Sequence, residues 1–273
     1  QCPLKEEFQQ QTLVINLPKN LTIHDVQWLS VMSPGADVDF GHTAIKLSKN
    51  QGIQPHLPPI SEQDAILEAQ GWPATKLIAV PQGKETEIKF TLGPAAGTKA
   101  KSLRGSCDSL EKVWYAEGLM QPEIWLQRGT RYVFQIFGGK SNPFYMTTDK
   151  EGGFATKNTT EKKNIINILG DKGQAVGQLC EHAMVNDQTD PDSFADFSDF
   201  SPNLVLNCPS KKRSFEIKWG ADTTDLNDFY YGSYKAKFMG GKVRLCDRID
   251  DSDENDPKCL RFKKSKKIVK TVL

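Results

Sequence analysis

Six cysteines constrain this chain more than any other feature of its sequence. None of them belongs to a Cys-x-x-Cys pair, so their spacing argues against a zinc site and for three disulfide bonds. Disulfides form in oxidising compartments, and they therefore predict an extracellular protein. Sequence proximity favours the pairs Cys246–Cys259 and Cys180–Cys208, which leaves Cys2–Cys107 to tie down the N-terminus, with other connectivities open.

The start of the chain and two sequons point in the same direction. The chain begins Gln1-Cys2-Pro3 rather than with methionine, as after signal-peptide cleavage. The triplets that start at Asn20 and Asn158 predict N-glycosylation of these two residues. No apolar run approaches the roughly 20 residues needed to span a bilayer. We therefore expect a secreted glycoprotein without a transmembrane segment.

The composition is that of an ordinary folded protein. Of the 273 residues, 25% are charged and 38% are hydrophobic, which is neither disordered nor membrane-like. The net charge of +1 gives no reason to expect a nucleic-acid partner. The length suits one large or two modest domains, each with its own core.

Strand patterns dominate the chain. In residues 87–92, for example, the hydrophobic side chains alternate with polar ones. Residues 61–70 carry the one clear helix pattern, with a capping box, and residues 160–169 suit a second short helix. Residues 93–100, rich in Gly and Ala, suggest a flexible linker or a long loop. Many short strands separated by Gly and Pro turns predict a β-sandwich or barrel.

Several motifs in the second half of the chain carry a family resemblance. The segments 114–119, 122–124, 132–134 and 142–149 resemble the C-terminal domain of Skeletor-type proteins, and the likeness extends over about residues 110–249. Residues 17–41 resemble the end of the module that Skeletor and Knickkopf proteins carry at their N-termini. Residues 50–105 show no such resemblance.

The resemblance implies an extracellular protein whose C-terminal domain is similar to cupredoxins, which are Greek-key β-sandwiches. Family members are associated with extracellular matrix and cuticle, and electron transfer has been suggested for the N-terminal module. This chain has Met32-Ser33 where the family usually has Trp-Cys, so the proposed redox cysteine is missing. A matrix role carried over from arthropod relatives is an analogy of fold alone.

We expect an all-β protein with little helix, built from a cupredoxin-like Greek-key sandwich and a smaller β-rich N-terminal module. The predicted divisions are a β-rich module with one short helix, the sandwich, and an acidic loop with a basic tail, over residues 1–105, 106–249 and 250–273.

A blue-copper site needs two imidazoles, a thiolate and usually an axial methionine. Cys180, His182 and Met184 lie close together, but Asn142 stands where the resemblance places the upstream histidine. Cys180 also has Cys208 as a disulfide partner, and an oxidised sulfur supplies no thiolate. We expect no complete copper site, no other metal and no certain cofactor.

Catalytic patterns are missing from the sequence. The four histidines are scattered, no G-x-S-x-G motif occurs, and no carboxylate pair stands out as acid and base. We therefore expect a protein that is not an enzyme. The acidic run 250–256 suits a solvated hairpin tip better than a calcium site, because it lacks the spacing of an EF-hand.

Two further stretches carry open alternatives. Phe194, Phe197 and Phe200, spaced three apart, either pack as one face of a short helix or line a ligand site, and packing is favoured. The basic tail 263–270 either contacts anionic glycans, membranes or matrix polyanions, or adds an edge strand.

We expect a secreted binding protein that carries an apolar small molecule such as a carotenoid or lipid. An extracellular matrix or adhesion protein is the alternative, and copper or haem electron transfer is a further one. The sequence is also compatible with a homo- or hetero-dimer or a matrix partner. The aromatic residues that we expect to line the ligand site are Trp114, Tyr115, Trp125, Phe144, Tyr145, Tyr230 and Tyr231.

Overall fold

The computed structural model describes residues 25–33, 38–45, 71–81, 83–104, 110–170, 172–210, 213–250 and 257–261. The chain divides into two compact units, one from Leu4 to Gln70 and one from Gly71 onward. The described part of the first unit contains β1 (Trp28–Ser33) and β2 (Val38–Ala44), which form an antiparallel pair. The helix predicted at 61–70 lies outside the described residues.

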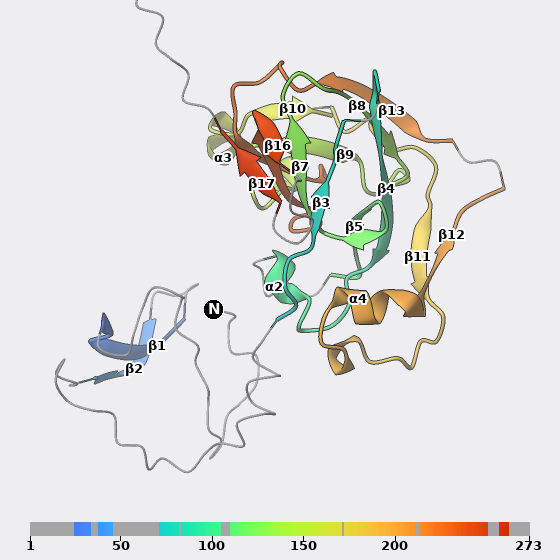
Figure 1. Cartoon of the computed structure of the whole chain (residues 1–273). Helices are drawn as coiled ribbons and strands as arrows, with labels where there is room; N and C mark the ends of the chain where they lie inside the picture. The colour runs from blue at the N-terminus through green and yellow to red at the C-terminus, as the bar shows by residue number, and fades with distance from the viewer. Residues whose placement is uncertain are drawn as a thin grey trace, which may run out of the picture. The chain divides into compact units, whose positions relative to one another are not determined.

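The second unit is a β-sandwich (Figure 1). Its six-stranded sheet is mixed, because β3 and β15 run parallel to β7 while the other neighbours are antiparallel. In spatial order the strands are β10 (Asn167–Leu169), β9 (Phe144–Thr147), β14 (Asp228–Ser233), β15 (Gly241–Cys246), β7 (Glu123–Gln127) and β3 (Lys76–Ile78).

The seven-stranded sheet is organised around its longest strand, β4 (Thr86–Pro94). The first half of β4 pairs in parallel with β8, Leu92 pairs with the start of β11, and the other edge of β4 pairs with β5. The remaining strands are β12 (Leu204–Asn207), β11 (Glu181–Met184), β5 (Lys112–Ala116), β6 (Leu119–Met120), β8 (Arg131–Ile136) and β13 (Phe215–Gly220).

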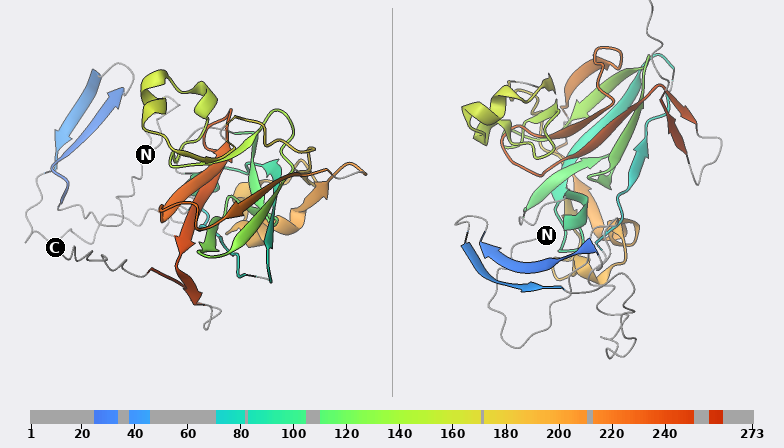
Figure 2. Two further views of the ribbon diagram at one scale, coloured as in Figure 1. Left: turned by 90° about the horizontal axis from the view of Figure 1, so that it is seen from above. Right: turned by 90° about the vertical axis from the view of Figure 1, so that its left-hand side faces the viewer.

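Helices are short and lie in the connections. The excursion that carries α3 lies to one side of the sheets in the right-hand view of Figure 2. A small hairpin of β16 (Arg248–Asp250) and β17 (Lys258–Leu260) follows the sandwich. In the part of the chain that the structure describes, the helices are α2 (Lys101–Arg104), α3 (Thr159–Lys163) and α4 (Phe197–Phe200), with 3-10 turns η2 (Phe154–Thr156), η3 (Pro191–Ser193) and η4 (Ser201–Asn203).

The main core fills the space between the two sheets. Alternation along β4 turns Ile88, Phe90 and Leu92 inward, as the period-two pattern predicts. Phe90 contacts four other rings and lies 4.5 Å from Phe144, centroid to centroid. Because large rings bury most apolar area per residue, this cluster supplies much of the stability of the unit.

A second core covers part of the outer face of the seven-stranded sheet. Trp72, Tyr115 from β5, and Phe197 and Phe200 from α4 are buried there. The Trp72 indole N–H donates to the carbonyl of Phe194 at 3.1 Å, which fixes the tryptophan against this cluster. All three phenylalanines pack here as predicted, but they do not form one helix face, because Phe194 precedes α4.

The stretch 93–100 is not a free linker. Its first two residues end β4, and the Asp192 carboxylate accepts hydrogen bonds from the backbone N–H groups of Thr98 and Lys99, both at 2.8 Å. These bonds tie the stretch to a loop more than ninety residues later. The prediction of flexibility is wrong here, because Asp192 supplies partners that composition cannot reveal.

The structure confirms an all-β sandwich with little helix. Two predicted disulfides are confirmed, Cys180–Cys208 and Cys246–Cys259, while Cys2 and Cys107 lie outside the described residues. The sequence-based division at residue 105 differs from the compact unit that starts at Gly71, because β3 and β4 pair with sandwich strands. Within the described part of the chain, no helix is long and apolar enough to cross a membrane.

Candidate functional site

The aromatic residues predicted to line a ligand site lie mostly in the cores. Trp114, Phe144 and Tyr231 belong to the main core, and Tyr115 belongs to the second core. Tyr145 is also fully buried. Their observed role is packing, and their role in ligand binding stays a prediction.

Trp125 and Tyr230 lie elsewhere. Tyr230 is half-buried. Trp125 is only 5% exposed and packs with Cys246 and Ile249 in a third, small core. Lys76 and Arg244 also lie over its ring, at 5.0 and 5.5 Å from the centroid. The Trp125 indole N–H donates to Glu123 at 2.6 Å. Cation–π contacts and this hydrogen bond therefore occupy the tryptophan that a ligand would need to reach.

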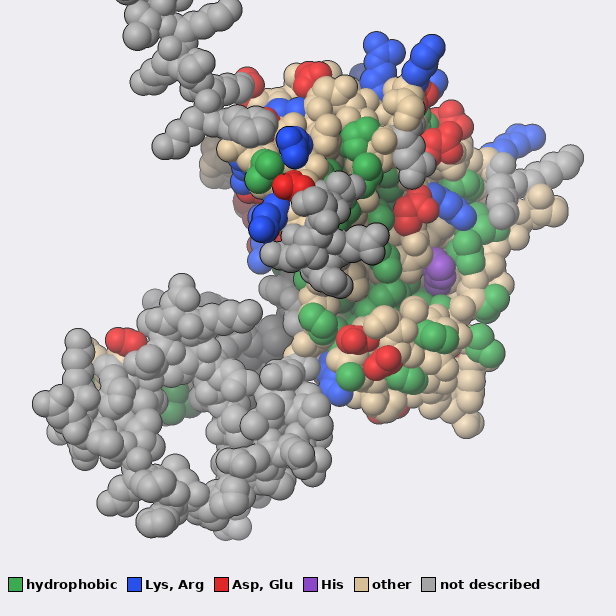
Figure 3. Space-filling view, viewed as in Figure 1, with side chains coloured by type: hydrophobic (Ala, Val, Ile, Leu, Met, Phe, Trp, Pro, Cys, Tyr) green, Lys and Arg blue, Asp and Glu red, His purple; other side chains and the backbone are tan. Residues whose placement is uncertain are grey.

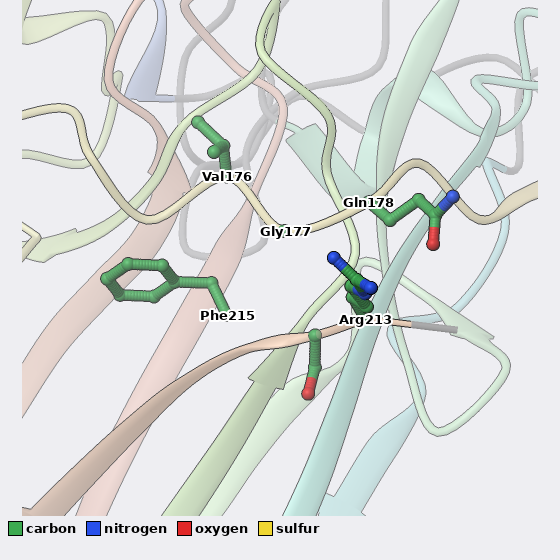
Figure 4. A pocket seen from close by; sticks show the side chains of 6 residues that line it. Val176, Gly177, Gln178, Arg213 and Phe215 are labelled. Carbon is green, nitrogen blue, oxygen red and sulfur yellow. The ribbon is translucent and has the colours of Figure 1, made fainter. Parts of the chain in front are cut away.

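Among the described residues, a hollow at one edge of the seven-stranded sheet is a candidate binding site (Figure 4). It has a volume of about 530 Å³, within the usual range for small-molecule sites. It forms where the segment that leads into β11 passes the start of β13. Its lining residues are Val176, Gly177, Gln178, Arg213, Ser214 and Phe215.

Gly177 makes the floor of this hollow possible. Its backbone has φ of +58°, and a Cβ at this position would lie 1.9 Å from the carbonyl oxygen of Ile136 in β8. Only glycine allows the crossing segment to approach the sheet this closely. The Gly138 N–H donates to the Val176 carbonyl and the Gln178 N–H to the Arg213 carbonyl, both at 2.8 Å. The hollow is therefore built on a hydrogen-bonded backbone.

The lining has an apolar side and a polar side. In Figure 4 the side chains of Val176 and Phe215 lie to one side of Gly177, and those of Gln178 and Arg213 lie to the other. Phe215 is 39% exposed although it is aromatic. The Gln178 Oε1 is buried, and among the described residues it has no hydrogen-bond partner. Such a site suits a ligand that is partly apolar and partly polar.

Further apolar side chains are exposed on the neighbouring hairpin. Leu179 precedes β11, Val185 follows it, and Val205 lies in β12 opposite Ala183. Figure 3 shows hydrophobic side chains at the surface in the region of β11 and β12. Because β12 is the last strand of its sheet in this direction, this apolar surface continues to an open sheet edge.

The three donors of the predicted copper motif have separate surroundings. The Cys180 sulfur is bonded to Cys208, and Met184 packs against the second core. The His182 ring stacks on Tyr115 at 4.7 Å between centroids. Burial, and then the positive charge of Lys89, lower the pKa of His182, so its imidazole is neutral at pH 7.

Asn142 is half-buried in the loop before β9. Across the described residues, no three His, Cys, Asp or Glu side chains cluster as metal ligands would. The expectation that copper is missing stays a prediction.

A cluster of charged side chains around the buried Lys157 was not predicted from the sequence. The Lys157 ammonium lies 3.0 Å from both Asp149 and Glu151, and Lys237 lies 3.2 Å from Glu151. Burial opposes the charge of Lys157, but hydrogen bonds to the two carboxylates outweigh this effect and raise its pKa. The hydrogen bond from Lys157 likewise lowers the pKa of Glu151. These pairs hold the β9–α3 connection in place.

The sequon at Asn158 lies at the surface. Asn158 is the N-cap of α3, and its Oδ1 accepts a hydrogen bond from the Glu161 N–H at 2.9 Å. N-glycosylation uses the other side-chain atom, Nδ2, so the cap and a glycan are compatible. Glycosylation of Asn158 stays a prediction, and Asn20 lies outside the described residues.

Comparison with known proteins supports the resemblance drawn from the motifs. No protein-family model matches the chain. The chain is 30% identical over 152 residues, half of its length, to Protein Skeletor, isoforms B/C, of Drosophila melanogaster. The match to isoforms D/E has the same identity and length. This chain resembles Skeletor-type proteins.

The shared part is a small fraction of the relatives. It covers 19% of isoforms B/C and 10% of isoforms D/E, so the activity of the whole relative does not transfer to this chain directly. The Skeletor likeness and the two disulfides are consistent with an extracellular protein.

Proposed function

We propose that this chain is a secreted, non-enzymatic binding protein that carries an apolar small molecule such as a lipid or a carotenoid, and that the hollow between Gly177 and Phe215 is its binding site. The two-sided lining of the hollow is the observation that carries this proposal. A hollow of about 530 Å³ takes one end of such a molecule.

Phe215 supplies the main apolar contact in this proposal. Covering an exposed aromatic side chain with an apolar ligand removes both surfaces from water, which contributes roughly 1.5 kcal/mol or more. The sheet fixes Phe215, because this residue pairs with Ile136 of β8. The contact therefore costs little ordering of the protein.

The test compares two serine variants in titrations with an uncharged, polarity-sensitive fluorophore. We expect Phe215→Ser to weaken binding about tenfold, equivalent to about 1.4 kcal/mol. Ile166→Ser is the matched control, because Ile166 is 58% exposed and is not part of the hollow. Equal affinities for the two variants, or no saturable binding to the unmodified chain, would overturn the proposal.

An extracellular matrix or adhesion role is the second candidate, and the exposed Val185 and Val205 favour it. Apolar side chains beside an open strand edge suit contact with another protein. In this case Val205→Lys reduces co-sedimentation with insoluble extracellular matrix, whereas Val80→Lys, at another exposed valine, leaves it unchanged. Equal co-sedimentation of both variants would argue against this candidate.

A further inference from the structure

The geometry points to an anionic ligand: we infer that the apolar molecule held in the hollow ends in a carboxylate, and that the guanidinium of Arg213 binds this group. This inference rests on the proposed function, because it specifies the chemical class of the ligand at the same site. Its basis is the charge and the hydrogen-bonding capacity of the lining.

Arg213 is available to a ligand. Its side chain is exposed, and among the residues that the structure describes it forms no ion pair and no side-chain hydrogen bond. The guanidinium presents several N–H donors in a plane, which matches a carboxylate in a bidentate arrangement. Because the Arg213 carbonyl accepts the Gln178 N–H at 2.8 Å, the backbone of the arginine is fixed at the hollow.

The other polar lining residues fit the same group. Gln178 and Ser214 offer an amide and a hydroxyl, and no Asp or Glu is among the six lining residues. The Gln178 Oε1 is an acceptor and cannot bind a carboxylate, so the atom of this amide that fits the anion is its Nε2 donor. Among the described lining residues, one positive charge thus stands beside neutral polar groups, which favours an anion over a cation.

The apolar side determines the rest of the ligand. Val176 and Phe215 face the hollow away from Arg213, so a carboxylate at the arginine directs an attached chain or ring over these two side chains. The ligand class is therefore a long-chain or polyene carboxylic acid.

The experiment titrates the protein with a fluorescent polyene fatty acid and with the alcohol of the same chain length. We expect the acid to bind about tenfold more tightly than the alcohol, as for one charge-assisted hydrogen-bonded contact. In Arg213→Gln the acid falls to the affinity of the alcohol, and the affinity for the alcohol does not change. Arg131→Gln, at another exposed arginine, keeps the preference for the acid.

The remaining outcomes separate this inference from the proposed function. If the acid and the alcohol bind equally well, or if Arg213→Gln keeps the preference, the carboxylate assignment is wrong while the apolar site stands. If neither compound binds, both proposals are wrong. Thermal unfolding of each variant establishes that it is folded during the titration.

Discussion

The sandwich core and the edge hollow use their side chains in opposite ways. In the core, aromatic rings contact one another and are closed off from solvent, as Phe90, Trp114 and Phe144 show. Among the described residues of the hollow there is a single aromatic one, Phe215, but it is exposed and lies near an arginine whose side chain has no described partner. An abundance of aromatic residues therefore identifies where this chain is stabilised. Exposed apolar groups beside uncommitted polar groups identify where it can bind.

The largest expected effect is in the core. Trp114→Ala removes a fully buried indole, and we expect the free energy of unfolding to fall by about 3–5 kcal/mol. Trp114→Phe is the control and costs much less, because the Trp114 indole N–H is buried with no described hydrogen-bond partner. Denaturant unfolding measures both. A fully folded Trp114→Ala protein with unchanged stability would contradict the role of this core.

Gly177→Ala tests whether the hollow depends on its backbone. A Cβ at 1.9 Å from the Ile136 carbonyl oxygen forces the crossing segment away from β8. We therefore expect the free energy of unfolding to fall by about 3 kcal/mol and ligand binding to be lost. Gly129→Ala is the matched control, because Gly129 also has positive φ but no atom within 4 Å of an added Cβ. We expect Gly129→Ala to lower the free energy of unfolding by about 1 kcal/mol and to leave ligand binding intact. Equal losses in the two variants would show that the close approach is unimportant.

Lys157→Met tests a charged cluster that stabilises the sandwich without taking part in the hollow. We expect a loss of about 2 kcal/mol near neutral pH, because Asp149 and Glu151 lose their shared cation, and no change in ligand affinity.

The pH dependence of Lys157→Met follows from the pKa shift of Glu151. The pKa of Glu151 is lowered in the folded protein, so its contribution is present above the ordinary value of 4.5 and is lost as the pH falls through the lowered value. The raised pKa of Lys157 means that its contribution is lost only at alkaline pH, above the ordinary value of 10.5. Denaturant unfolding as a function of pH checks this. The variant should lose less stability than the unmodified chain on acidification, and an equally large loss would contradict the assignment.

Phe215→Ser has the smallest expected effect on stability. We expect less than about 1 kcal/mol, because the ring is already partly in water, although the same change weakens ligand binding. The small loss of stability contrasts with the large loss expected for Trp114→Ala. Thermal unfolding measures this stability. A large loss in Phe215→Ser would show that Phe215 is part of the stabilising core.

Local patterns of the sequence predict much of the fold. Period-two alternation places Ile88, Phe90 and Leu92 on the inner face, and proximity along the chain identifies both described disulfides. The contacts that composition misses join distant residues. Asp192 accepts a hydrogen bond from the Thr98 N–H, although the two residues are 94 positions apart in the sequence. No local sequence pattern predicts this hydrogen bond.

The candidate site could not be predicted from the sequence for the same reason. The hollow forms where two distant segments meet, residues 176–178 and 213–215. They meet because Gly177 passes close over β8 and because the Gln178 N–H donates to the Arg213 carbonyl. An isolated glycine between Val176 and Gln178 gives a weak signal of close backbone approach, but it does not identify the partner. The sequence did show aromatic residues in abundance, and the structure shows that most of them are needed for packing.

The central claim is that ligands bind at the hollow and not among the core rings. The most direct measurement is a backbone-amide NMR titration of the protein with a long-chain carboxylic acid. We expect saturable shifts that concentrate on residues 176–179 and 213–215, with small changes in β4, β5 and β9. Shifts that concentrate instead on Trp114, Phe144 and Tyr231 would place the ligand inside the sandwich and contradict the account.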